Sequence, residues 1–211
     1  DGSNNSQKII EISVEEKPTG EISAGAGIGT TGGSFAFNIR ENNWLGKGIN
    51  IGTNIDVSAE RFSGGVSITD PNYNFSGNSL TVFGSRTTNN KKNSGYKNNI
   101  ISTGIGTKFE QYRNFYISPT LLYQYDDLTV EDTASKSLKK QKGTFSNISL
   151  DYAITVDERN RVYRPTDGYI SSFSQEIPLY ADSPYLRNTY QFSKYQTFSP
   201  NAIGSFKFYT T

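Results

Sequence analysis

Apolar and polar residues alternate with a period of two along most of the chain, in successive segments that each have the length of one strand. In the third segment, for example, Ile49, Ile51 and Ile55 occupy one set of alternate positions, and Asn50 and Asp56 occupy the other. Alternation of this kind is typical of a β-strand with one apolar face, and no segment sustains the period of a helix. The pattern predicts eleven strands, at residues 20–30, 34–41, 49–57, 62–69, 79–86, 100–110, 115–125, 146–157, 169–177, 189–198 and 202–209.

The composition of the polar positions indicates which face of the sheet meets water. These positions hold mainly Gly, Ser, Thr and Asn, with isolated charges such as Arg40 and Lys108, whereas the outer face of a soluble sandwich would carry many Lys and Glu. A transmembrane barrel instead turns its apolar set outward and encloses a polar interior. The sequence therefore predicts an all-β, antiparallel up-and-down transmembrane β-barrel in which Phe37, Ile51 and Leu150 face hydrocarbon.

The connections between the expected strands fall into two alternating sets. One set is tight and rich in aromatic residues, which favours an aromatic girdle at a membrane interface over ordinary hairpin packing. The other set is polar and longer, as expected for loops on the opposite side of a membrane. The first set comprises residues 44–48, 70–78, 112–114, 163–168 and 198–201, and the second includes residues 87–99 and 126–143.

The composition excludes several classes of chemistry. The chain has no His and no Cys, so Ser-His-Asp and Cys-His catalysis, the usual zinc sites and disulfides are all ruled out, and only carboxylates, Lys and hydroxyl groups remain. A net charge of +1 argues against nucleic acid as a partner. No apolar stretch approaches the ~18 residues of a transmembrane helix. Because the chain begins at Asp1 and contains no Met, we interpret it as part of a longer protein.

Two motifs have a simpler interpretation than their pattern suggests. Residues 27–32 match G-x-G-x-x-G, but a strand follows them, whereas a dinucleotide-binding motif must open a helix. Asp70, Asn72 and Asn74 have the spacing of a calcium loop, but Phe75 stands where that loop requires Gly, so a turn is expected. The Lys-rich residues 136–142 are expected to form a solvated loop, with contact to lipopolysaccharide as the alternative.

Four segments together resemble one known family. Residues 14–29, Val-Glu-Glu-Lys-Pro-Thr-Gly-Glu-Ile-Ser followed by a Gly-rich strand, are similar to the junction between the last periplasmic POTRA domain and the first barrel strand of BamA-type outer-membrane assembly proteins. Residues 42–48, 69–73 and 164–168 are similar to three periplasmic turns of the same family, in the same order and spacing. The turn residues that carry this resemblance, or that form the expected girdle, are Trp44, Leu45, Gly46, Asp70, Pro71, Tyr73, Tyr112, Pro165, Thr166 and Gly168.

The resemblance implies a domain organisation, a location and a set of partners. The family's barrel has sixteen strands, so residues 19–211 would be its amino-terminal part, about eleven strands, and residues 1–18 the tail of the last POTRA domain or a linker. The family's sixth loop and closing strand are not in this sequence. Membership would place the protein in the bacterial outer membrane, in contact with the bilayer and lipopolysaccharide, with unfolded outer-membrane proteins as substrates and accessory lipoproteins as partners.

The implied activity is the insertion of β-barrel proteins through a weakly paired first strand that acts as a lateral gate, and the resemblance implies neither an enzyme nor a cofactor. Glycine packs no side chain in a strand and costs about 0.5–1 kcal/mol relative to Ala. Such a strand could separate from the closing strand and pair with an incoming one, although its glycines could instead relieve crowding in the barrel wall. Alternatives are a TamA-like or two-partner-secretion transporter, a general porin, or a soluble β-sandwich. The expected gate strand is Gly20, Glu21, Ile22, Ser23, Ala24, Gly25, Ala26, Gly27, Ile28 and Gly29.

Overall fold

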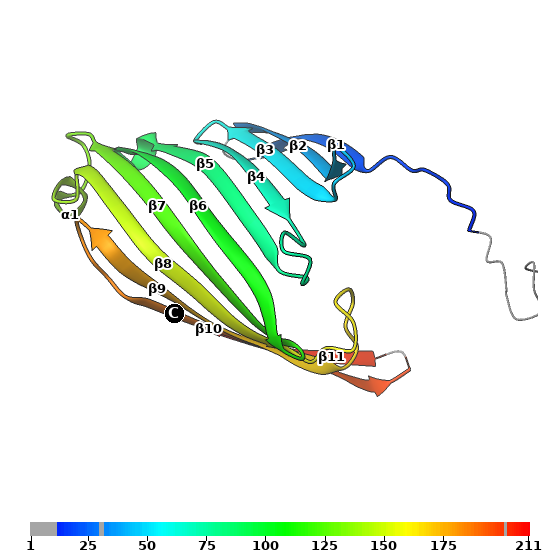
Figure 1. Cartoon of the computed structure of the whole chain (residues 1–211). Helices are drawn as coiled ribbons and strands as arrows, with labels where there is room; N and C mark the ends of the chain where they lie inside the picture. The colour runs from blue at the N-terminus through cyan, green and yellow to red at the C-terminus, as the bar shows by residue number, and fades with distance from the viewer. Residues whose placement is uncertain (1–11, 30–31, 201) are drawn as a thin grey trace, which may run out of the picture.

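Eleven antiparallel strands form one continuous sheet in which every strand pairs with the next along the chain (Figure 1). This computed structural model describes residues 12–29, 32–200 and 202–211. The number of strands and the antiparallel up-and-down order confirm the predicted fold class. The strands are β1 (Gly20–Gly29), β2 (Gly32–Trp44), β3 (Ile49–Ser58), β4 (Arg61–Asp70), β5 (Ser79–Lys91), β6 (Tyr96–Tyr112), β7 (Phe115–Val130), β8 (Gly143–Asp157), β9 (Gly168–Ala181), β10 (Arg187–Ser199) and β11 (Ala202–Thr210).

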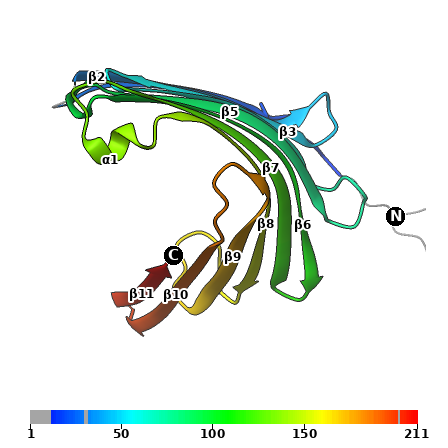
Figure 2. The same ribbon diagram turned by 90° about the vertical axis from the view of Figure 1, so that its left-hand side faces the viewer.

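The sheet is curled into a trough, and β1 and β11 form its two edges (Figure 2). A short helix, α1 (Lys136–Lys139), lies on the concave side, and a single 3-10 turn (Lys92–Ser94) connects β5 to β6. Residues 12–19, which precede β1, are neither helix nor strand. Residues 1–11, most of the expected POTRA tail, lie outside the described residues, so this domain boundary stays a prediction.

The register separates two faces of the sheet, because partners across an antiparallel ladder point to the same side. Ile105 pairs with Leu121, and Leu121 pairs with Leu150, which gives an apolar row across β6, β7 and β8. On the other face, cross-strand hydroxyl groups bond to one another, as in Thr155 Oγ1 to Ser172 Oγ at 2.9 Å. The sequence therefore produces one apolar and one polar face.

The polar face is the concave one. A cavity lined by the polar-face residues Asn98 and Asp126 is also lined by Gln141, which belongs to the connection that carries α1. Figure 2 shows α1 on the concave side of the sheet, so this polar face looks into the trough and the apolar face is convex. This agrees with the expected arrangement of a membrane barrel.

No dry core exists among the described residues. Leu150 remains 37% exposed and Ile105 46% exposed on the convex face, and only Gly95, Val130 and Ser149 are buried in the described part of the chain. Phe37 faces the same side, because it pairs with Ile55 in an apolar row. A soluble β-sandwich would pack two apolar faces against each other, so the single sheet excludes that alternative.

The prediction that connection length distinguishes the two ends of the sheet is wrong. β5, β6 and β7 extend beyond the predicted ends, which shortens the expected loop 87–99 to residues 92–95 and the loop 126–143 to residues 131–142. At the opposite end, residues 71–78 and 158–167 form connections of 8 and 10 residues, which fall between these two lengths. Polar residues such as Asn89 and Asn98 still pair in the ladder, because backbone hydrogen bonds do not require an apolar face.

The calcium-like spacing at the β4–β5 connection forms a turn, as predicted. The Asp70 carboxylate accepts a hydrogen bond from the Asn72 amide at 3.0 Å, and the Asn72 side-chain oxygen accepts one from the Gly77 amide at 2.7 Å. The Asn74 side chain accepts one from the Ser76 amide at 3.2 Å. These oxygens are therefore used within the turn itself. The G-x-G-x-x-G segment contributes to β1 and β2 and opens no helix, with residues 30 and 31 outside the described part.

Candidate functional site

The first strand is paired on one side only among the described residues. β1 pairs with β2 in a continuous register from Gly20 opposite Glu41 to Gly29 opposite Gly32. All ten of its residues are exposed, and Ile28 reaches 96%. The predicted gate residues therefore form one strand whose second edge has no partner among the described residues.

Antiparallel geometry identifies which backbone groups face that edge. The Asn42 amide donates to the Thr19 carbonyl at 3.2 Å, and this pair belongs to the same register as β1 and β2. Because hydrogen-bonded pairs alternate in an antiparallel ladder, the odd-numbered residues of β1 bond to β2. The even-numbered residues, Ile22, Ala24, Ala26 and Ile28, direct their N–H and C=O groups to the open edge.

Asn42 holds the start of β1 in place. In addition to its backbone amide, its side-chain nitrogen donates to the Thr19 carbonyl at 3.0 Å. The neighbouring Glu41 carboxylate accepts a hydrogen bond from the Asn43 amide at 2.8 Å. This clamp joins residues far apart in the sequence, and sequence reasoning missed it because Asn42 belonged only to a turn motif.

The glycines of β1 differ in the space around them. Among the described residues, a Cβ atom added to Gly25 or Gly29 would meet nothing within 4 Å, whereas one added to Gly20 would approach the Glu41 carboxylate at 2.9 Å. A Cβ atom at Gly104, in the middle of the sheet, would lie 2.7 Å from the Phe83 ring. Crowding therefore explains Gly104, whose Cβ would also approach the Leu121 carbonyl, but not Gly25 and Gly29, and at Gly20 the flexible Glu41 side chain could move away.

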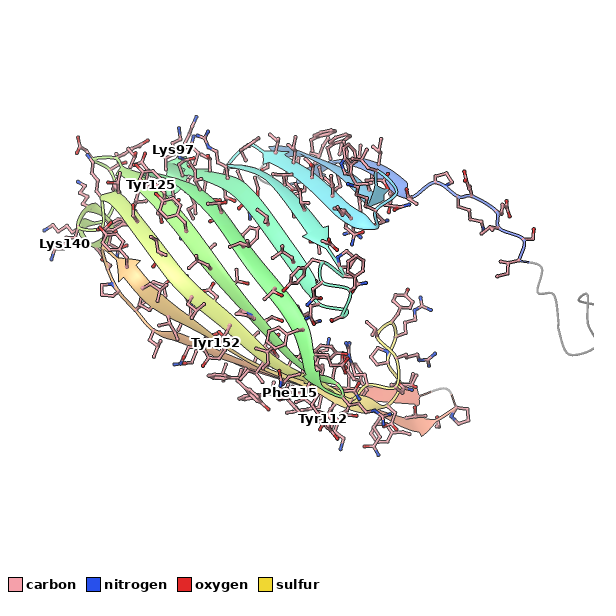
Figure 3. All side chains as sticks on the ribbon, in the orientation of Figure 1. Lys97, Tyr112, Phe115, Tyr125, Lys140 and Tyr152 are labelled. Atoms are coloured by element: carbon pink, nitrogen blue, oxygen red, sulfur yellow. The ribbon has the colours of Figure 1, made fainter. Side chains whose placement is uncertain are left out.

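The predicted turn residues gather at one end of the sheet. Trp44 ends β2, Tyr112 ends β6 and Gly168 begins β9, and all three ends lie on the side where the chain enters β1. Tyr112 is 77% exposed there, and Figure 3 shows it close to Phe115, with Tyr125 at the opposite end of β7. Aromatic residues thus mark both ends of the convex face, as in an interfacial girdle. The other turn residues placed at the same end are Leu45, Gly46, Asp70, Pro71, Tyr73, Pro165 and Thr166.

The β8–β9 turn is held by a dense network of hydrogen bonds. Arg159 forms an ion pair with Asp157 at 2.6 Å, and the hydrogen bond between the two side chains raises the pKa of Arg159 above its ordinary value. Asn160 donates to the Thr166 hydroxyl at 2.7 Å and accepts from the Thr166 amide at 3.1 Å. Gly168 closes the turn with a φ of 91°. The predicted Pro-Thr-x-Gly turn is therefore a rigid element.

The described residues contain no group of three or more His, Cys, Asp or Glu side chains arranged to hold a metal ion. Within the same residues, no helix is long and apolar enough to cross a membrane.

Comparison with known proteins gives the family. A family model described as the Omp85 superfamily domain matches residues 43–210. The crystal structure of BamA from Haemophilus ducreyi lacking POTRA domains 1-3 has a similar fold, with a TM-score of 0.72 and 21% sequence identity over 93% of this chain and 42% of that one. The chain thus spans less than half of the length of that structure. With its partial outer-membrane barrel fold and a family match from the end of β2 to the end of β11, the chain belongs to the Omp85 superfamily of the bacterial outer membrane.

Proposed function

We propose that this chain is the amino-terminal part of the barrel of an outer-membrane protein insertase, and that the open edge of β1 pairs with strands of unfolded barrel proteins. The observation that carries the proposal is the alternation in β1. Its free backbone groups belong to the residues with small or apolar side chains on the convex face, including Ala24 and Ala26. An incoming strand can therefore hydrogen-bond to this edge from the lipid side by β-augmentation.

The glycines of β1 support the proposal through energetics. Packing among the described residues does not require Gly25 and Gly29, yet each weakens the strand by about 0.5–1 kcal/mol relative to Ala. Weak pairing lowers the free energy needed to separate β1 from a closing strand. The proposed partners are the unfolded substrate at this edge, lipid and lipopolysaccharide around the wall, and accessory lipoproteins on the periplasmic side.

Two transporter functions remain as second candidates within the superfamily. A TamA-like protein or a two-partner-secretion transporter would share this fold and these turns. The weakly packed β1 favours the insertase, because a transporter that moves its substrate through the lumen does not need an edge exposed to lipid. A general porin is not supported, because the family that matches is the Omp85 superfamily.

A disulfide lock tests the gate directly. In the intact protein, Ala26→Cys paired with a Cys on the closing strand is expected to reduce the insertion of a barrel substrate into liposomes to background under oxidising conditions. Reduction of the disulfide should restore the rate. The matched control is Ser193→Cys with Lys207→Cys, which locks β10 to β11 at directly paired positions and should leave insertion unchanged. Full activity of the oxidised Ala26→Cys protein would contradict the gate.

Gly25→Ala is expected to slow insertion about two- to fivefold, the factor that corresponds to 0.5–1 kcal/mol of added strand stability. The new methyl group enters open space, so the fold is retained. Gly104→Ala is the matched comparison: its Cβ would meet Phe83 and lie 2.9 Å from the Leu121 carbonyl, so it should lower the melting temperature instead. Amide hydrogen exchange of β1 together with the insertion rate checks both variants. Faster exchange of β1 in Gly25→Ala would contradict the energetic argument.

A further inference from the structure

The apolar band on the convex face ends in the same cross-strand row on the neighbouring strands β6 and β7. Ile101 of β6 pairs with Tyr125 of β7, and these are the last apolar and aromatic residues of their alternating sets. In the next row outward, Thr88, Asn99 and Asp127 face the same side. This boundary lies at the end of the sheet opposite the turns of Trp44 and Tyr112, and is the extracellular boundary in the orientation of the proposed function, on which this inference rests.

An arginine stands within the apolar band at this boundary. Arg86 pairs with Ile101 and follows Leu80 and Val82 in the convex set of β5. A charged side chain facing lipid costs about 2–4 kcal/mol at the bilayer midplane and about 0–1 near the interface. Its Nε donates to the Asn99 side-chain oxygen at 2.8 Å, so the side chain is turned outward, toward the head groups.

Asn99 fixes the position of this guanidinium group. Its side-chain oxygen also accepts a hydrogen bond from the Thr88 hydroxyl at 2.9 Å. No other hydrogen bond of the Arg86 guanidinium is formed with the described residues, so its two terminal nitrogens can bind another acceptor. A guanidinium fork binds the oxygens of a phosphate in a bidentate manner.

A second cation lies on the same face, two rows further out than Arg86. Lys97 is exposed, pairs with Asn90 and Thr129, and appears in Figure 3 near Tyr125 at the extracellular end. Among the described residues, neither Arg86 nor Lys97 has a carboxylate oxygen within 4.0 Å, since the three ion pairs involve other residues. Asp127, directly opposite Asn99, is the acidic residue that faces this patch.

The Lys-rich connection between β7 and β8 lies elsewhere. Its helix α1 is on the concave side (Figure 2), and Gln141 of the same connection lines a cavity with Asn98. The lysines at residues 136–142 are therefore attached over the interior of the trough, away from the lipid-facing wall.

We propose that Arg86 and Lys97 form a binding site for the phosphate group of an anionic outer-leaflet lipid, on the convex wall of β5 and β6. The occupant is the phosphorylated sugar of lipopolysaccharide, because the site sits where hydrocarbon gives way to head groups and presents two cations to the lipid side. Tyr125 borders the site at the depth where aromatic rings lie in membrane interfaces. Acyl chains of the bound lipid run along the apolar rows beneath it.

Lipid binding to the intact protein tests this site. The protein in neutral detergent is titrated with diphosphoryl lipid A, and bound lipid is counted by native mass spectrometry. Arg86→Gln with Lys97→Gln is expected to weaken binding about fivefold for each charge removed. Asp127→Asn should strengthen it. The matched control is Arg61→Gln, a basic residue near the same end of β4 whose side chain faces the concave side with Ser63, and it should leave binding unchanged.

Three results would overturn the site: unchanged binding in the double variant, equal loss in Arg61→Gln, or equal affinity for lipid A without phosphate groups. Inorganic phosphate that displaces lipid A when present at the same concentration would show that Arg86 and Lys97 bind a free anion. That result would also contradict a lipid site. Insertion measured in phosphatidylcholine vesicles should stay at the wild-type rate in the double variant, so this test and the test of the gate fail independently.

Discussion

Ala24→Pro and Ala26→Pro are each expected to reduce substrate insertion roughly tenfold or more, while β1 remains paired with β2. The N–H groups of both residues point to the open edge, so proline removes a donor that an incoming strand would use but that β2 does not need. An unsatisfied backbone carbonyl on the substrate strand costs about 1–3 kcal/mol. Proline is also tolerated on edge strands when its missing N–H faces away from the ladder.

Gly25→Pro is the matched control for these variants. The N–H of Gly25 faces β2, so proline there removes a ladder hydrogen bond and should detach part of β1. Insertion rate and amide exchange of β2 separate the two outcomes. Ala24→Pro should show slow exchange in β2 with lost insertion, and Gly25→Pro should show fast exchange. A wild-type insertion rate in both Ala24→Pro and Ala26→Pro would contradict the role of the β1 edge in insertion.

Gly168→Ala is expected to destabilise the barrel by on the order of 3 kcal/mol, the cost of a backbone clash combined with a strained conformation. Its φ is 91°, and an added Cβ would collide with the Glu158 carbonyl oxygen and lie 2.9 Å from the Arg159 Cα. Neither contact can be relieved by rotating a side chain. Urea unfolding from detergent or liposomes, followed by tryptophan fluorescence of Trp44, measures the loss.

Gly48→Ala separates the energetic cost of a positive φ from the cost of a backbone clash. Gly48 also has a positive φ, 69°, but nothing lies within 4 Å of its added Cβ. Alanine there should cost only about 1 kcal/mol, the penalty of the left-handed region. Equal destabilisation by the two variants would show that the contacts of the β8–β9 turn do not determine its stability.

The sequence predicted strands well where one face meets lipid and the other water. The predicted segments 49–57 and 62–69 lie within one residue of β3 (Ile49–Ser58) and β4 (Arg61–Asp70). Prediction failed at the outer ends of β5 and β6, because residues such as Asn89 and Lys97 lie beyond the apolar band and both faces there are polar. Alternation disappears in such a region although the ladder continues.

Part of the candidate site could also be predicted from the sequence. Local turn motifs placed Trp44 and Gly168 at one end, since a turn is specified by a few consecutive residues. The bond from Asn42 to Thr19 joins distant segments, so it required the register. In the sequence, Arg86 is visible only as a charge that interrupts the apolar positions of its strand. Its pairing with Ile101 is needed to show that it lies at the end of the apolar band on the convex face.

The two bonds from Asn42 to Thr19 also determine which part of the wall would move in the proposed gate. At the other end of the strand, Gly29 pairs directly with Gly32, so β1 is held to β2 at both ends. On the proposed mechanism, β1 and β2 would therefore move together as one hairpin when the closing strand separates. The closing strand would then return to an edge whose register has not changed.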